Sequence, residues 1–155
     1  MTLNCCGIVV TKMPKSPLHE LVAQKLTDVL LDQVPKEFKV RCKRPLTLRD
    51  SEPEPDISVV KGKPDDWATA HPSTAQLVIE VAVSREAVAE TKADICADAG
   101  IPEYWLVRAE ERAVKVYRNP TANGYLSRRT LNENDTLHCS EVPSVAFPVS
   151  AAVYT

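Results

Sequence analysis

Two carboxylates stand beside apolar strand-like sequence, where a charge needs an explanation. Glu80 lies inside LVIEVAVS, residues 77–84, and Asp56 opens DISVV, residues 56–60. Burying a carboxylate in an apolar strand is costly unless something pairs with it or coordinates it. If the two strands are neighbours, both side chains can reach one point. Two carboxylates with room left for water and phosphate suit a hard divalent cation.

Lys92 is the third candidate for this site. At about 100° per residue, Ile95 and Ala99 fall within roughly 20° of Val88, and Lys92 falls near 40°, on the predicted apolar half of a helix. An ammonium beside two carboxylates could orient or deprotonate a water, or neutralise charge developing on a phosphate. Asp56, Glu80 and Lys92 together would be the parts of a metal-dependent phosphodiesterase.

Each of the three residues also has an ordinary structural interpretation. Asp56 follows Pro55, and this pair is common in turns. Glu80 could pair with a buried arginine such as Arg41, and Lys92 could extend its ammonium to water along an apolar stem.

The elements that must position these residues can be read from the spacing of apolar side chains. Ser16 and Pro17 predict the start of a helix whose buried face continues to Leu30. A second helix is predicted at about 85–99, with Gly100 just beyond its end. Strands are predicted at 7–13, 38–42, near 46–48, and at 57–60, 76–84, 103–107, 113–119 and 125–131.

This order predicts an α/β (α+β) fold, a mixed β-sheet flanked by helices, in one domain of residues 1–155. The strand at 76–84 is apolar on both faces and is expected to be central. A crossover through the second helix, from residue 77 to residue 107, should be right-handed.

Composition excludes several classes of protein. No apolar run approaches the roughly 18 residues of a membrane span. The four glycines cannot form a nucleotide-binding loop, so we expect neither a membrane nor a nucleotide cofactor as a partner. Five scattered cysteines without metal-ligand spacing suggest a reducing, cytoplasmic location.

The formal net charge is -2, but residues 36–49 hold six basic residues against one acidic residue. Within this segment Lys39, Arg41 and Lys43 alternate with apolar neighbours, which predicts a strand with one basic face. That face is either simply solvated or lies along nucleic-acid phosphates.

The ordered set of Pro55-Asp56, Glu80 within VIEV, Lys92 and the string AGIPEYWLV at 99–107 resembles the Uma-type restriction endonuclease family. This family belongs to the PD-(D/E)xK nuclease superfamily, and the resemblance runs from about residue 7 to residue 117. It implies a restriction-endonuclease-like fold and Mg²⁺-dependent cleavage of DNA, with Mn²⁺ as a substitute cofactor. A homodimer is a further expectation, because two-fold pairing lets two sites address two strands.

The resemblance assigns roles by position. Asp56 and Glu80 match the two acidic metal ligands, and Lys92 matches a catalytic lysine moved onto the following helix, since Ala82 fills the usual superfamily position. Glu20 or His19 could supply an accessory group from the first helix.

Two positions depart from the family pattern. Val88 stands where an aspartate is common, and Cys96 stands where a tyrosine is common. They leave open a second hypothesis: a nuclease-fold protein that has lost catalysis and serves as a DNA-binding or oligomerisation module.

Overall fold

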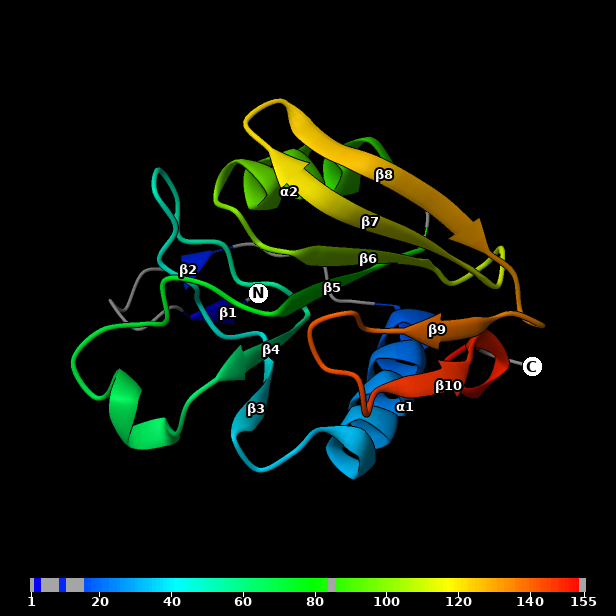
Figure 1. Ribbon diagram of the computed structural model, residues 1–155, viewed down its shortest axis with the longest axis horizontal. Coiled ribbons are helices and arrows are strands. Elements are labelled where there is room, and N and C mark those ends of the chain that lie inside the picture. The colour runs from blue at the N-terminus through cyan, green and yellow to red at the C-terminus, as the bar shows by residue number, and fades with distance from the viewer. Residues whose placement is uncertain (1, 4–8, 11–15, 84–85, 154–155) are drawn as a thin grey trace.

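The computed structural model describes residues 2–3, 9–10, 16–83 and 86–153, and its centre is a six-stranded sheet in the order β3-β4-β5-β6-β7-β8 (Figure 1). The strands are β3 (Phe38–Cys42), β4 (Ile57–Lys61), β5 (Leu77–Ala82), β6 (Glu103–Arg108), β7 (Ala113–Thr121) and β8 (Gly124–Leu131). Neighbours are antiparallel except β5 and β6, which are parallel and are joined through helix α2 (Glu86–Asp98). The predicted mixed sheet with flanking helices is confirmed.

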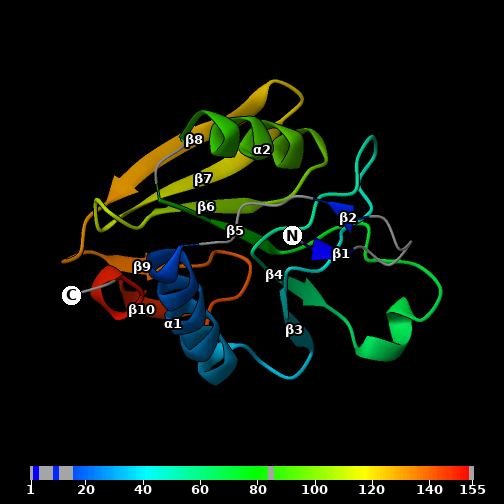
Figure 2. The ribbon, with the colours of Figure 1, turned by 180° about the vertical axis from the view of Figure 1, so that it is seen from behind.

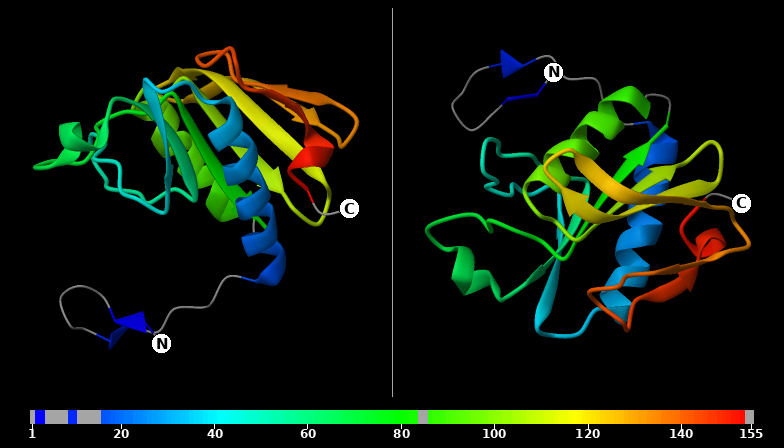
Figure 3. Two further views of the ribbon diagram at one scale, coloured as in Figure 1. Left: turned by 90° about the horizontal axis from the view of Figure 1, so that it is seen from below. Right: turned by 45° about the horizontal axis from the view of Figure 1, so that its top comes forward.

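Each face of the sheet has its own apolar core. Helix α1 (Pro17–Gln33) and the hairpin of β9 (Thr136–His138) and β10 (Ala146–Pro148) pack on the face that carries Ile57, Ile79 and Trp105. Helix α2 packs on the opposite face, against Val78 and Leu106. Figure 2 shows α2 lying across β7 and β8, and Figure 3 shows the β9–β10 hairpin beside α1. We call these the α1 face and the α2 face.

Shorter elements complete the described chain. They are β1 (Thr2–Leu3), β2 (Val9–Val10), the 3-10 turn η1 (Pro64–Trp67) and the 3-10 turn η2 (Val149–Ala151). β1 and β2 form a separate antiparallel pair. Most of the strand predicted at 7–13 lies outside the described residues. None of the described helices combines the length and the apolar character that a membrane-spanning segment requires.

Helix α1 begins as its sequence predicts. The Ser16 hydroxyl accepts a hydrogen bond from the backbone N–H of His19 at 3.1 Å, and Pro17 occupies the first turn. Its buried side chains recur at three- and four-residue spacing: His19, Val22, Leu26 and Leu30. The polar His19 therefore stands on the apolar stripe of the helix.

Helix α2 ends as predicted but is rotated relative to the prediction. Gly100 has φ 79°, its N–H donates to Ala97, and the N–H of Ile101 donates to Cys96, which is a Schellman ending. The buried face consists of Ala93, Cys96 and Ala97, whereas Ile95 is 39% exposed. These small side chains let α2 approach the sheet closely. The sequence predicts that the face with Ile95 is buried, and this prediction is wrong.

The strand predicted near Leu46–Leu48 is wrong. The segment is irregular and is held by local bonds from Leu46 N–H to Pro53 O and from Leu48 N–H to Ser51 O. Both leucines are buried in the α2-face core. Leu46 and Leu48 are buried and Thr47 between them is exposed because an irregular turn covers the sheet here. Their spacing resembles that of a strand, but the segment pairs with no strand of the described sheet.

Glu103, at the start of β6, is fully buried and ties three segments together. Its carboxylate accepts hydrogen bonds from Trp105 Nε1, Arg118 Nε and both the N–H and the hydroxyl of Ser140. Glu103 thus links β6 to β7 and to the segment after β9.

Removing this carboxylate should destabilise the fold. Glu103→Ala leaves buried donors without an acceptor, and we expect a loss of about 3–5 kcal/mol in the free energy of unfolding. Urea denaturation measures this. Glu111→Ala, which removes an exposed partner of Arg108, should cost no more than about 1 kcal/mol. Equal losses in the two variants would contradict the role given to Glu103.

Candidate active site

The sheet register brings Asp56 and Glu80 together. β4 and β5 are antiparallel neighbours with Ile57 opposite Ile79, so Asp56 falls opposite Glu80, one step beyond the last pair of the ladder. The backbone N–H of Asp56 donates to Glu80 Oε1 at 3.1 Å. Each residue is only 6% exposed. The two carboxylates therefore share one partly enclosed position where the β4–β5 ladder ends.

Lys92 reaches this pair from α2. Its Nζ lies 3.1 Å from Glu80 Oε2, and its side chain is 45% exposed against 9% for the Glu80 side chain. Lys92 flanks the buried face of α2 formed by Ala93 and Cys96. Its ammonium thus contacts a buried carboxylate while close to half of the side chain remains exposed to solvent.

His19 completes the contacts of Asp56. Its Nε2 lies 3.1 Å from Asp56 Oδ2, and the same oxygen accepts the backbone N–H of Val81 at 2.9 Å. His19 is buried, and its Nδ1 has no hydrogen-bond partner within the described residues. Asp56 is thus anchored by β5 and α1, while its other oxygen, Oδ1, accepts no hydrogen bond from the described chain.

Of the two accessory candidates, only His19 contacts Asp56. Glu20 is exposed and points to Lys43 Nζ, 3.2 Å from Glu20 Oε1. Position in the first turn explains the difference, because residue 19 lies on the buried stripe of α1 and residue 20 lies beside it.

Electrostatics make the pair of carboxylates receptive to a cation. Burial raises the pKa of Glu80, the facing charge of Asp56 raises it further, and Lys92 acts in the opposite direction. A divalent cation would remove the repulsion between the two carboxylates. The geometry thus favours positive charge at the end of the β4–β5 ladder.

The donor set fits Mg²⁺. Across the described ranges, no three His, Cys, Asp or Glu side chains form a ligand cluster. Mg²⁺ does not need such a cage, because it is commonly held by one or two carboxylates and keeps several waters. Asp56 and Glu80 would supply those carboxylates, and Asp56 Oδ1 is available for this role.

Cys96 of α2 lies near the site, and its thiol is buried. Burial is the main cause that raises the pKa of its thiol, to about 12, and the Glu80 charge adds to the effect. The side chain packs with Ala93 and Ala97 in the α2-face core.

The three basic residues predicted to form one face are divided by the structure. Lys39 and Arg41 pair with Val60 and Ser58 of β4 and leave the sheet on the α2 face. Lys43 lies beyond the end of β3 with φ 52°, and its side chain turns to Glu20. The positive φ, which sequence alternation cannot reveal, separates Lys43 from the other two.

Arg41 does not pair with Glu80, so that structural alternative is wrong. Its guanidinium donates to Pro45 O at 3.3 Å and lies 4.9 Å from the centre of the Trp67 ring. Sequence reasoning missed Trp67, although a lone aromatic residue in a polar, proline-containing loop was an available signal.

Comparison with solved structures gives a likeness over nearly the whole chain. It matches the "Crystal structure of a putative nuclease belonging to DUF820" from Anabaena variabilis, with a TM-score of 0.78 and 17% identity, over 94% of this chain and 86% of that one. At this identity the likeness shows a shared fold. No curated protein matches.

The family comparison matches residues 2–150 to "Uma2: Putative restriction endonuclease". The match includes the Asp56–Glu80 pair, Lys92 and residues 99–107, which carried the resemblance in the sequence. The chain therefore belongs to the Uma2 family.

Proposed function

We propose that this protein is a Mg²⁺-dependent endodeoxyribonuclease that hydrolyses phosphodiester bonds of DNA. The observation that carries the proposal is the buried Asp56–Glu80 pair with Lys92 Nζ 3.1 Å from Glu80. Membership of a family described as "Putative restriction endonuclease" supports it. So does the shared fold with a protein whose title names "a putative nuclease".

Each residue of the site has a role in this proposal. Asp56 and Glu80 would hold Mg²⁺, which would supply polarisation of a phosphate oxygen and acidification of water. Lys92 orients the attacking water or neutralises charge developing on the phosphate. His19 holds Asp56 in place from α1, as partners of metal ligands commonly do.

A homodimer acting on two DNA strands is part of the same proposal. We also propose a cytoplasmic location, which Cys42, Cys96 and Cys139 support, since all three are free thiols.

The direct test combines a cleavage assay with a calorimetric titration. Purified protein is incubated with supercoiled plasmid and with linear single- and double-stranded DNA, in Mg²⁺, in Mn²⁺ and with a chelator. We expect metal-dependent nicking of the plasmid, since one internal cut suffices to relax it, and Mn²⁺ binding without DNA. Cleavage that persists in the chelator would contradict the proposed chemistry.

A non-catalytic DNA-binding protein is the second candidate function. This candidate is supported by a departure from the family pattern beside the site. Cys96 is a buried thiol at the position where a tyrosine is common in the family. This alternative predicts salt-sensitive DNA binding in the chelator and no cleavage with any cation. The same assays therefore separate the two functions.

His19→Ala should weaken the proposed activity without abolishing it. The substitution removes a buried partner of Asp56, and loss of such supporting contacts typically costs 10–100-fold in activity or metal affinity. Initial cleavage rates at saturating Mg²⁺ measure the effect. Gln24→Ala, a change at an exposed position of α1 whose side chain bonds Asp28, serves as the control. Similar losses in both variants would argue against a specific role for His19.

A further inference from the structure

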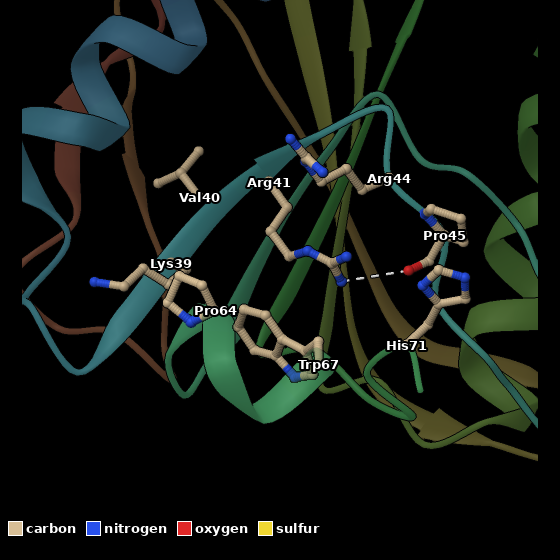
Figure 4. Close-up of a pocket in the computed structure, with 8 residues that line it drawn as sticks. All are labelled: Lys39, Val40, Arg41, Arg44, Pro45, Pro64, Trp67 and His71. Carbon is tan, nitrogen blue, oxygen red and sulfur yellow. Dashed lines mark hydrogen bonds between the residues drawn. The ribbon is translucent and has the colours of Figure 1, made fainter. Parts of the chain in front are cut away.

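A second polar pocket lies on the α2 face, beside β3 and the loop that contains η1. It has a volume of about 400 Å³ and is lined by Lys39, Val40, Arg41, Arg44, Pro45, Pro64, Trp67 and His71 (Figure 4). None of these eight residues carries a negative charge. The pocket thus combines two guanidinium groups with an aromatic ring and two prolines, separate from the residues of the candidate active site.

Arg41 is the unusual residue of this pocket. It is only 9% exposed, and within the described chain its guanidinium makes no ion pair. It rests on Trp67 and donates one hydrogen bond to Pro45 O, while Lys39 points its ammonium away (Figure 4). Burial, and then the nearby charge of Arg44, lower the pKa of Arg41. An anion bound here would give the buried guanidinium an ion-pair partner and would offset the repulsion between Arg41 and Arg44.

The ring of Trp67 lies close to the backbone of its own loop and is partly buried against the α2-face core. Gly62 has φ 135°, and a methyl group at this position would lie 3.1 Å from Trp67 Cζ2 and 2.9 Å from Asp66 Oδ2. The Asp66 carboxylate accepts the backbone N–H of Lys63 at 3.0 Å. The ring of Trp67 therefore packs directly against the turn at Gly62, where a side chain would not fit.

The pocket lies near the candidate active site on the same side of the sheet. Arg41 is directly opposite Ser58, which is two residues along β4 from Asp56. Two residues along a strand and one step between strands place the backbones of Arg41 and Asp56 roughly 8 Å apart. A polymer bound at Asp56 and Glu80 could therefore enter the pocket with a neighbouring unit.

We propose that the pocket binds one unpaired nucleotide of a DNA strand next to the phosphodiester that is cleaved. Arg41 and Arg44 contact its phosphate, and Trp67, Pro45 and Pro64 contact its base. The volume suits a single small ligand, and aromatic rings beside guanidinium groups are the usual means of holding unpaired bases. This inference rests on the proposed nuclease function for its place in the reaction, whereas its test measures binding alone.

The experiment is a binding titration in the chelator, with a labelled single-stranded thymidine oligonucleotide followed by anisotropy. Trp67→Ala should weaken binding about ten-fold or more, whereas Trp67→Phe, which keeps an aromatic ring, should recover most of the affinity. Arg44→Ser should reduce the slope of log affinity against log salt by about 0.7, the value for one phosphate of a single strand. Lys61→Ser is the matched control, because Lys61 is exposed on the same strand pair but lies on the α1 face.

Tryptophan fluorescence locates the bound strand. The oligonucleotide should quench the wild-type signal and leave Trp67→Phe, whose remaining Trp105 is fully buried, unchanged. Quenching that persists in Trp67→Phe, or an equal effect of Lys61→Ser and Arg44→Ser, overturns the proposal. Competition by inorganic phosphate as effective as that of thymidine monophosphate also overturns it, since it reveals an anion site without base contact. Thermal unfolding of each variant controls for folding.

The two proposals fail in different ways. Loss of oligonucleotide affinity in Trp67→Ala, together with no cleavage by the wild type, supports the pocket and removes the nuclease. Wild-type oligonucleotide affinity in Trp67→Ala, together with metal-dependent cleavage by the wild type, removes the pocket and leaves the nuclease.

Discussion

Asp56→Asn is expected to remove Mn²⁺ binding and DNA cleavage together while the protein stays folded. Asparagine has the size of aspartate but no charge, so the cation loses one of its two carboxylates. We expect metal affinity to fall by more than about a hundred-fold, the upper end of the range for residues that only support a ligand. Calorimetric titration of Mn²⁺ measures affinity, and plasmid nicking measures activity.

Stability separates this effect from unfolding. Asp56 faces Glu80, whose pKa its charge raises, so removing that charge relieves repulsion. The melting temperature without metal should therefore not fall. Asp28→Asn makes the same chemical change at an exposed position of α1 and should leave binding and cleavage unchanged. Full Mn²⁺ affinity in Asp56→Asn would exclude Asp56 as a ligand and remove the main support for the proposed chemistry.

Lys92→Met should separate catalysis from metal binding. Methionine retains much of the apolar stem of lysine but removes the ammonium near Glu80 Oε2. Because Lys92 is not a ligand, Mn²⁺ affinity should be kept or increased, since the ammonium no longer competes for the carboxylate. Loss of a group that positions water or neutralises transition-state charge should reduce the cleavage rate by about 10²–10⁴-fold.

Lys115→Met is a closely matched control. Lys115 pairs with Glu90 of α2 at 2.8 Å and is also partly buried, but it lies on β7, outside the candidate site. Its replacement should leave the cleavage rate unchanged. If Lys92→Met cut DNA as fast as the wild type, the lysine would be a structural partner of Glu80 and no part of the chemistry.

The sequence allowed the carboxylate pair to be predicted because strand periodicity fixes which residues share a face. Asp56 and Glu80 lie close together only if β4 and β5 are neighbouring strands, and the sheet order shows that they are. The Schellman ending at Gly100 was likewise local, set by a residue that tolerates positive φ.

What could not be predicted depends on packing between distant segments. The rotation of α2 follows from how closely Ala93 and Ala97 can approach the sheet, which periodicity alone does not give. The division of the basic face depends on the backbone conformation of Lys43. Trp67 reaches Arg41 because a loop folds back over β3, and loop direction is not encoded in apolar spacing.

The end of the β4–β5 ladder has a consequence for observing the site. Beyond Ile57 and Ile79, the N–H of Asp56 donates to the Glu80 side chain, and the N–H of Val81 donates to the Asp56 side chain. The two carboxylates thus take the place of main-chain acceptors where the strands part. A cation coordinated by these carboxylate oxygens would change the electronic environment of the two backbone N–H groups that donate to them. The amide resonances of Asp56 and Val81 are therefore built-in reporters, able to register occupancy of the site before any substrate has been identified.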